Sequence, residues 1–400
     1  MSDNDRARKV VIASFLGWML DAFDFFLMVF VFSDIAKTFG VSITTVTVAV
    51  TLTLAMRALG AFIFGRLADR FGRRPMLMLS VLCYSILELL SGLAPSLATF
   101  LILRALFGIA MGGEWGVGAS LTMETVRPES RGVVSGILQA GYSSGYLIAS
   151  IAYGVLFPTF GWRGLFMIGI LPALLVLYIR RNVSESPGWN GGRTHESGVG
   201  HVLARHWQLA VYAILLMTCF NFLSHGTQDV YPTFLKVDHA FRPHEVSVIL
   251  VIANIGAILG GITFGTMSQY YGRRRMMIIG ALFCLPVLPL WAFSQDVILL
   301  TIGAFVMQFM VQGCWGLVPA YLNEISPSEV RGTFPGVVYQ LGNFLASSNA
   351  WLQGVLAISL GSYGWSLAAV CASAAVLLAF FASIGREARD VDMRVAAPAE

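Results

Sequence analysis

A cluster of polar side chains interrupts an apolar run near the middle of the chain, where residues 221–233 read NFLSHGTQDVYPT. In a helix, Asn221, His225 and Asp229 fall at i, i+4 and i+8 and share one face, with Gln228 beside them. Imidazole titrates near physiological pH, and a carboxylate one turn away stabilises its charged form. The cluster therefore predicts a site that binds a polar substrate and carries a proton; the alternative is a histidine that only makes structural hydrogen bonds.

The composition places this site in a membrane. Of the 400 residues, 56% are hydrophobic and only 12% are charged, whereas a soluble domain carries about 25% charged residues. We therefore predict an all-α integral membrane protein of the plasma membrane, in bacteria the inner membrane. The formal net charge of +4 is dispersed over short loops, which argues against a nucleic-acid partner. The five cysteines all lie in apolar runs, without a metal-site or disulfide spacing.

Twelve apolar runs have about the 20 residues that a membrane-spanning helix needs. We expect spans near 11–33, 44–66, 76–95, 97–121, 133–157, 164–181, 207–230, 246–268, 276–293, 297–322, 333–358 and 363–384. The first run has no convincing cleavage site, so it is interpreted as a span and not as a signal peptide. A polar Gly/Ser/His-rich stretch separates two sets of six, which predicts an N-terminal bundle (1–181), a cytoplasmic linker (182–206), a C-terminal bundle (207–386) and a cytoplasmic tail (387–400).

The two halves repeat each other with an offset of 200 residues. The segment GRLADRFGRR at 65–74 recurs as GTMSQYYGRR at 265–274, and GEWG at 113–116 recurs as GCWG at 313–316. Glu124 and its following Arg-Gly pair recur at Glu324. A duplicated six-helix bundle explains this pattern, and in such transporters the substrate site lies near the midplane between the repeats.

The distribution of Lys and Arg predicts the orientation. With the N-terminus inside, the cytoplasmic segments hold 20 of the 26 Lys and Arg residues and the outer loops hold four. Both termini are therefore expected in the cytoplasm. The remaining two, Arg57 and Arg104, lie within apolar runs.

Arg57 is the first candidate for substrate binding. A charge at the bilayer centre costs about 2.5–3.5 kcal/mol on insertion scales, so it must face a cavity or a partner. Its guanidinium can hold a carboxylate through two parallel hydrogen bonds. The alternative is a fixed ion pair with a neighbouring span, for example with Asp24.

Asp21 and Asp24 share one face of the first span. An apolar cavity favours the protonated form of a carboxylic acid, so either residue is a candidate proton carrier. Asp24 lies nearer mid-span and is the stronger candidate; a polar helix end or an arginine partner is the alternative. His225 with Asp229 is the second candidate pair.

Arg104 and Glu114 in the fourth span are further candidates for proton coupling. They lie about 15 Å apart along a helix axis, so we do not expect them to pair with each other. Glu88 either pairs with Arg104 or reaches the outer interface.

A third group of charges lies at the predicted cytoplasmic edge. The simpler interpretation is that these residues only reflect the positive-inside distribution of charge. The alternative is a charge network of Asp69 with Glu124, Arg131 and the facing half, which closes a cytoplasmic gate. Gln269 stands where the first repeat has Asp69. Because an amide carries no charge, we expect the contacts of the second repeat to hold the gate closed more weakly. The gate residues are predicted to be Asp69, Arg73, Glu124, Arg131, Glu324 and Arg331.

These motifs together resemble the major facilitator superfamily. The resemblance rests on 65–74 and its copy, on the Pro…Arg-Gly loops at 127–132 and 327–332, and on the Arg104, Gly108, Gly112 spacing. The stretch 221–233, with Ser224, also resembles the seventh-span signature of the lactate and pyruvate:proton symporters, in the sialate/monocarboxylate:proton symporter branch.

That resemblance implies several residue roles. Gln340 and Asn343 are similar to a substrate-site pair of the branch, and Arg57 stands where the branch places a substrate-related arginine. The fifth span contributes to the site in this superfamily, which suggests Gln139 and Tyr142. Arg104 resembles an arginine that is often tied to proton coupling. The linker is too short for the two extra spans of sialate transporters, which favours a small monocarboxylate.

We therefore expect a secondary active transporter that moves a small monocarboxylate of the lactate or pyruvate type together with a proton. A bulkier acid such as sialate or an aromatic acid, or a sugar, is the alternative substrate. The expected partners are the organic anion, the proton and the lipid bilayer; no cofactor and no obligate protein partner are predicted, so we expect a monomer. The enzyme motif His-Glu-x-x-His does not occur, and the single Gly-x-Ser-x-Gly match, GYSSG at 141–145, lies inside an apolar run and not between a strand and a helix, which argues against an intramembrane enzyme. The polar residues cluster in a few spans, which argues against a channel.

Overall fold

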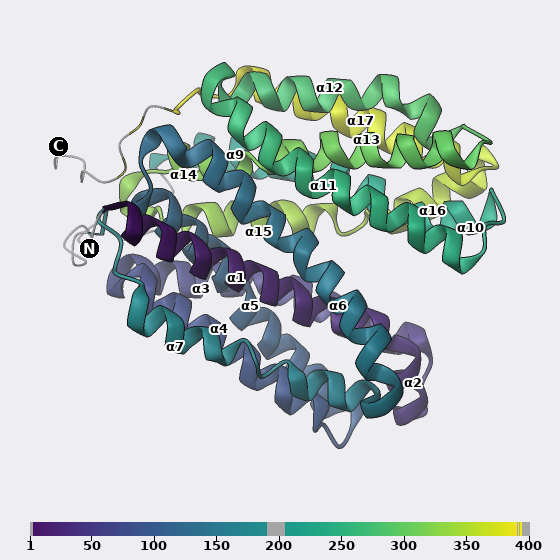
Figure 1. Ribbon diagram of the computed structural model, residues 1–400, viewed down its shortest axis with the longest axis horizontal. Coiled ribbons are helices and arrows are strands. Elements are labelled where there is room, and N and C mark those ends of the chain that lie inside the picture. Colours follow the sequence, from purple (N-terminus) through teal and green to yellow (C-terminus); the bar gives the residue numbers. More distant parts are fainter. Residues whose placement is uncertain (1–2, 190–204, 390, 392, 394–400) are drawn as a thin grey trace.

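The computed structural model describes residues 3–189, 205–389, 391 and 393, and over these residues it is all-helical (Figure 1). The N-terminal half contains α1 (Asp3–Phe30), α2 (Phe32–Phe39), α3 (Ile43–Phe71), α4 (Arg73–Gly92), α5 (Leu97–Thr125), α6 (Arg131–Ile168) and α7 (Ala173–Asn182). The C-terminal half contains α9 (Trp207–Gln228), α10 (Tyr231–Val237), α11 (Pro243–Tyr271), α12 (Arg273–Ala292), α13 (Val297–Trp315), α14 (Val318–Ile325), α15 (Phe334–Ala346), α16 (Asn349–Leu360) and α17 (Tyr363–Ile384).

Ten stretches of the described chain are long and apolar enough to cross a membrane. The stretch 128–182 holds two passes, because the helix breaks at Gly161, whose φ is +61°. The pass 334–360 is divided between α15 and α16, each of which is too short by itself. The predicted fold of twelve membrane-spanning helices in two six-helix halves is confirmed.

Two predicted spans of the C-terminal half are not continuous helices, and the seventh, which is continuous, is followed by a short extra helix. The span predicted at 297–322 is interrupted between Trp315 and Val318, and the span predicted at 333–358 is interrupted after Ala346. The seventh span ends at Gln228 and continues as the short α10. Prolines in the first turn of α10 and of α14 account for two of these breaks, since proline starts a helix well but cannot continue one.

The repeated loops have the same backbone conformation in both halves. Gly72 has φ of +105° between α3 and α4, and Gly272 has φ of +94° between α11 and α12. Both values fall where glycine is strongly favoured. The sequence repeat is therefore also a structural repeat, and it brings Asp69–Arg74 and residues 269–274 to the same end of the molecule.

The two halves meet mainly along two pairs of helices, α3 with α15 and α6 with α11, with further contacts of α5 and α6 to α14 and of α5 to α15. In Figure 1 they lie closer together at the end marked by the N and C labels than at the end that holds α2 and α10. We call the first the charged end, because it holds Asp69–Arg74, 124–131, 269–275 and 324–331, and the second the open end. Glycines allow the backbones to touch near the charged end: a Cβ on Gly265 would lie 2.5 Å from the carbonyl oxygen of Gly132.

This contact predicts a position where a single methyl group is not tolerated. Gly265→Ala should separate the two halves or strain α11, at a cost of about 1–3 kcal/mol that is typical of overpacking. We expect a lower midpoint of thermal unfolding for the detergent-purified protein. Gly154→Ala is the matched control, because nothing lies within 4 Å of its added Cβ; equal midpoints for the two variants would contradict the packing described.

Candidate functional site

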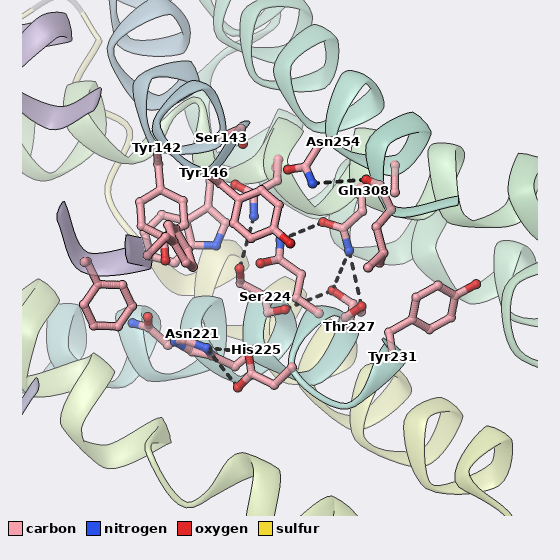
Figure 2. A pocket seen from close by; sticks show the side chains of 18 of the residues that line it. Tyr142, Ser143, Tyr146, Asn221, Ser224, His225, Thr227, Tyr231, Asn254 and Gln308 are labelled. Atoms are coloured by element: carbon pink, nitrogen blue, oxygen red, sulfur yellow. Dashed lines mark hydrogen bonds and ion pairs between the residues drawn. The ribbon is translucent and has the colours of Figure 1, made fainter. Parts of the chain in front are cut away.

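A cavity of about 450 Å³ lies between the two halves and is lined by residues of both. The N-terminal half supplies a largely aromatic and apolar wall that includes Trp18, Phe25, Phe26, Leu54, Tyr142 and Tyr146. The C-terminal half supplies a polar wall that includes Asn221, Ser224, His225, Gln228, Asp229, Asn254, Gln308 and Gln312 (Figure 2). Val29 and Pro232, near α2 and α10, also line the cavity, so it extends toward the open end.

The predicted polar face of the seventh span lies on this wall. His225 is in contact with two oxygen-bearing groups: its Nδ1 lies 3.2 Å from Asp229 and its Nε2 lies 3.1 Å from Oδ1 of Asn343. The first contact joins residues one turn apart on α9, as the spacing predicts, and the second joins α9 to α15. His225 and Asp229 are partly exposed to the cavity, with side-chain exposures of 32% and 39%.

Three amides of the cavity wall were not predicted. Gln308 and Gln312 lie one turn apart on α13, and Asn254 lies on α11. Gln308 accepts from Gln228 at 2.8 Å, and Gln312 donates to the hydroxyl of Ser224 at 3.1 Å. Gln308 and Gln312 have a sequence signal similar to that of the seventh span, polar residues at i and i+4 inside an apolar run, whereas Asn254 is a single amide in its run.

Arg57 does not line the cavity directly. It is 97% buried, its guanidinium carbon lies 5.8 Å from the ring centre of Trp18, and its Nη2 lies 3.5 Å from Oδ2 of Asp21. The partner considered in the sequence, Asp24, was therefore wrong; Asp21 faces Arg57. The long distance indicates a weak pair, and Nε of Arg57 has no hydrogen-bond partner among the described residues.

The remaining predicted substrate residues divide into two groups. Gln139 and Tyr142 of α6 line the cavity, and Tyr142 stacks on Trp18 with ring centres 5.4 Å apart. Gln340 is 99% buried outside the cavity wall, and neither of its polar side-chain atoms has a hydrogen-bond partner within the described chain. Asn343 reaches the cavity through His225.

A second buried ion pair lies in the N-terminal half. Arg104 donates to Glu88 at 2.7 Å and to the Ser91 hydroxyl at 2.6 Å, which resolves the alternatives for Glu88 in favour of pairing. Arg104 and Glu114 do not pair, as expected from their axial separation. The carboxyl oxygens of Asp24 and Glu114 are buried and have no hydrogen-bond partner among the residues the structure describes. Because an unpaired buried carboxylate is strongly unfavourable, both sites suit a neutral acid.

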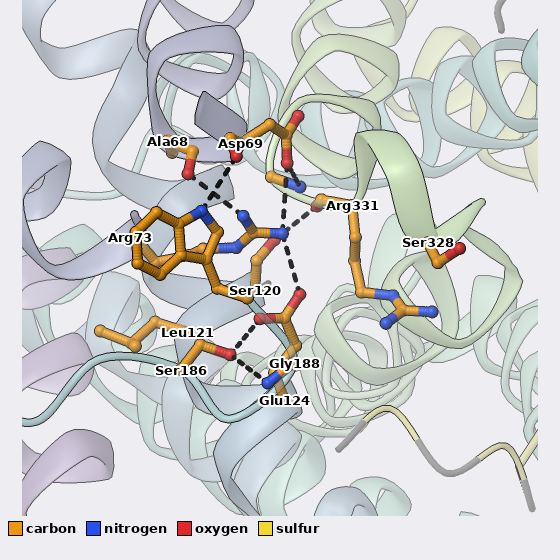
Figure 3. Close-up of polar contacts among 12 residues, drawn as sticks. Ala68, Asp69, Arg73, Ser120, Leu121, Glu124, Ser186, Gly188, Ser328 and Arg331 are labelled. Atoms are coloured by element: carbon orange, nitrogen blue, oxygen red, sulfur yellow. Dashed lines mark hydrogen bonds and ion pairs between the residues drawn. The ribbon is translucent and has the colours of Figure 1, made fainter. Parts of the chain in front are cut away.

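The charges at the charged end form a network around Arg73 (Figure 3). Arg73 lies 3.2 Å from Asp69 and 3.1 Å from Glu124, and all three residues are buried. Asp69 also accepts from the backbone N–H of Gly332 at 2.7 Å and from the Thr333 hydroxyl at 2.6 Å, both in the opposite half. A single carboxylate therefore makes two short hydrogen bonds between the two halves.

The predicted roles of the other gate arginines were wrong in part. Glu124 pairs with Arg73 and not with Arg131, whose guanidinium donates to the carbonyls of Met123 and Val391. Arg331 contacts the opposite half through its backbone carbonyl, which accepts from Ser120 at 2.7 Å. The spacing of charges in the sequence could not separate these contacts, because backbone carbonyls compete with carboxylates for arginine.

The second repeat has a similar network with fewer bonds between the halves. Arg273 contacts Glu324 through two bonds of 3.0 and 3.2 Å and Gln269 through one of 2.9 Å. Gln269 accepts a single bond from the opposite half, at 3.2 Å from the backbone N–H of Gly132. The neutral amide thus makes one longer contact where Asp69 makes two short ones.

These contacts predict unequal effects of two equivalent substitutions. Asp69→Ala removes two hydrogen bonds to a charged acceptor, each worth about 1.5–3 kcal/mol, so molecules open at the charged end should become at least tenfold more populated. Gln269→Ala should have a smaller effect. Distance distributions between spin labels at Arg127 and Arg275, both exposed, measure the opening. A distribution for Asp69→Ala that matches the unsubstituted protein would contradict the role given to Asp69.

Two family models match the chain in succession. One, described as Major Facilitator Superfamily, matches residues 14–230, and one described as Sugar (and other) transporter matches residues 219–387. The chain belongs to the Major Facilitator Superfamily. It is therefore a multi-pass membrane transporter and not an enzyme.

Individual relatives agree with this assignment. The sialic acid transporter NanX of Escherichia coli (strain K12) is 29% identical over 85% of this chain and 84% of its own length. A carboxylic acid transporter protein homolog of Saccharomyces cerevisiae is 30% identical over 86% of this chain and 60% of its own length. The solved structure of the proton:xylose symporter XylE has a TM-score of 0.80 at 19% identity and covers 95% of this chain and 96% of its own, which shows the fold. These names agree loosely with the sialate/monocarboxylate branch.

Proposed function

We propose that this transporter carries a small monocarboxylate of the lactate or pyruvate type together with a proton, by alternating access of one cavity to the two sides of the membrane. The observation that carries the proposal is His225, a titratable group on the cavity wall held between Asp229 and Asn343. A proton carrier must be reachable from the cavity and must alter the site when it is protonated. His225 meets both conditions.

The contacts of His225 suit its protonated form. Both ring nitrogens of imidazolium donate, and both face oxygens, of Asp229 and of the Asn343 side chain. Neutral imidazole has only one N–H, so one contact is lost unless the Asn343 amide turns its nitrogen toward the ring. Loss of the proton would therefore change the link between α9 and α15, which is a direct way for protonation to bias the shape of the cavity.

Arg57 supplies the second element of the proposal. Its weak pair with Asp21, behind Trp18, can be exchanged for a substrate carboxylate, because a guanidinium binds any carboxylate through the same donors. Protonation of Asp21 would free Arg57, and Asp21 would then need no cation. Substrate and proton would in this way support each other's binding, with Asn343 and Gln139 as neutral hydrogen-bonding groups near the anion.

The predicted topology gives the direction in which this conformation faces. If both termini are cytoplasmic, the charged end is the cytoplasmic gate and is closed by Asp69 and Gln269, and the cavity is open to the outside. Release of substrate inward would then require the bonds of Asp69 to Gly332 and Thr333 to break.

A bulkier acid is the second candidate substrate. The cavity of about 450 Å³ falls within the usual range for ligand pockets, about 300–1,000 Å³, and one relative is named for sialic acid. The apolar N-terminal wall and the polar C-terminal wall would suit an acid with distinct apolar and polar sides.

Proton coupling through His225 is tested by measuring two activities separately: exchange of substrate without a gradient, and uptake of substrate driven by a pH gradient. In proteoliposomes, His225→Gln should still exchange labelled lactate across the membrane without a gradient, because exchange needs no net proton movement. Uptake driven by an imposed pH gradient should fall at least tenfold. Tyr146→Phe, which removes only a hydroxyl from the opposite wall, serves as control. Retention of gradient-driven uptake in His225→Gln would rule out the proposed role.

A further inference from the structure

The amides of the cavity wall have orientations that the surrounding backbone determines. The Nδ2 of Asn221 donates to the carbonyl of Met217 at 2.8 Å, and the Nδ2 of Asn254 donates to the carbonyl of Leu250 at 3.1 Å. A backbone carbonyl can only accept, so in each case the amide nitrogen must face it. The Oδ1 atom of each residue is therefore left for another partner.

The orientation of the Gln228 amide follows in the same way, from the hydrogen bonds that connect Thr227, Gln308 and Gln228. The hydroxyl of Thr227 donates to a backbone carbonyl, and the Nε2 of Gln308 donates to the Thr227 carbonyl at 3.4 Å and to its hydroxyl oxygen at 3.2 Å. Gln308 must then turn its Oε1 toward Gln228, whose Nε2 donates to it at 2.8 Å. The Oε1 atom of Gln228 is thus the free end of the chain.

The side-chain oxygens of three amides on one wall of the cavity can therefore each accept a hydrogen bond from a substrate. Asn221, Gln228 and Asn254 all line the cavity, and within the described residues no donor contacts their side-chain oxygens. Each amide also keeps one N–H, so acceptor and donor lie side by side. A hydroxyl group, which both donates and accepts, matches such a wall; a carboxylate can accept from the N–H groups but cannot donate, so it leaves the amide oxygens unpaired.

We propose that this wall, made of Asn221, Gln228 and Asn254 and oriented by Thr227 and Gln308, is a hydroxyl-binding subsite that makes the transporter select hydroxylated acids. The inference rests on the proposed function, in which the carboxylate is held by Arg57 and the residues around His225. It narrows the proposed substrates to acids that carry at least one hydroxyl group, such as a short 2-hydroxy acid of the lactate type or a longer polyhydroxy acid, and it excludes pyruvate, which has none. An acid of equal size without a hydroxyl leaves the amides unpaired and is rejected for that reason.

The N-terminal half shows which residue can replace Asn254 in the test, because the repeat has an equivalent position there. Leu54 occupies the position that corresponds to Asn254 in the repeat, and it also lines the cavity. Asn254→Leu therefore introduces the residue that the fold already accepts at the equivalent place. Gln228→Met is a second variant, of similar length and without polar atoms. Ser143→Ala, on the N-terminal wall, is the control.

The measurement is the dissociation constant of lactate and of propionate, which differ by one hydroxyl, from ligand-induced stabilisation of the purified full-length protein. Glycerate, gluconate and sialate extend the series, and glycerol provides hydroxyls without a carboxylate. We expect lactate to bind the unsubstituted protein at least tenfold more tightly than propionate. In Asn254→Leu and Gln228→Met the ratio should fall to within about threefold, with propionate binding unchanged; in Ser143→Ala the ratio should persist.

The outcomes separate this inference from the proposed function. Equal binding of lactate and propionate, or an equal loss of both in Asn254→Leu, would overturn the hydroxyl subsite and leave monocarboxylate transport in place. Binding of glycerol but of no acid, abolished by Asn254→Leu, would overturn the proposed function and support the subsite. Binding of none of these compounds would overturn both.

Discussion

The cost of an unpaired polar group in an apolar environment is the constraint on which this structure depends. A lipid bilayer offers no water to satisfy such a group, so a polar side chain within a span must pair, bond to backbone or face a cavity. Many of the described polar residues follow this division: Arg104 pairs with Glu88, Asn221 bonds to the Met217 carbonyl, and His225 faces the cavity. Asp24, Glu114 and Gln340 are exceptions, since they are buried without a hydrogen-bond partner among the described residues. The position of each group therefore indicates its role.

The repeat gives the two halves the same architecture and different chemistry. Asp21 in α1 corresponds to Asn221 in α9, Leu54 corresponds to Asn254, and Asp69 corresponds to Gln269, each with an offset of 200 residues. Near the cavity, the first half has the buried charges, including Arg57 and Asp21, and the second half has neutral hydrogen-bonding groups together with His225 and Asp229. The cavity lies between these two sets of residues. Because the two halves are in contact at the charged end, that contact determines how far apart the two sets lie.

Much of this arrangement could be predicted from the sequence, because periodicity and composition are local signals. The contact of His225 with Asp229 follows from a spacing of four residues, and the twelve spans follow from apolar length. The partner of Arg57 did not follow, since Asp21 and Asp24 share one helix face and only the rotation of α1 against α3 distinguishes them. The partner of Glu124 did not follow either, because Arg73 and Arg131 both also bond to backbone carbonyls, and which of them reaches Glu124 is a property of the packed structure. Gln308 and Gln312 did not follow although their pattern is present in the sequence, because a neutral amide in an apolar run is a weaker signal than a charge, whose burial costs more free energy.

The central claim is that substrate and proton move together, and one measurement tests it directly. Purified protein is reconstituted in vesicles that contain a pH-sensitive dye, without an imposed gradient, and lactate is added outside. The account predicts acidification of the interior beyond that of protein-free vesicles, and its loss when Arg57 is replaced by glutamine. Protein-dependent lactate uptake without any change in internal pH would contradict coupling, and unchanged acidification in the Arg57 variant would contradict the proposed anion site.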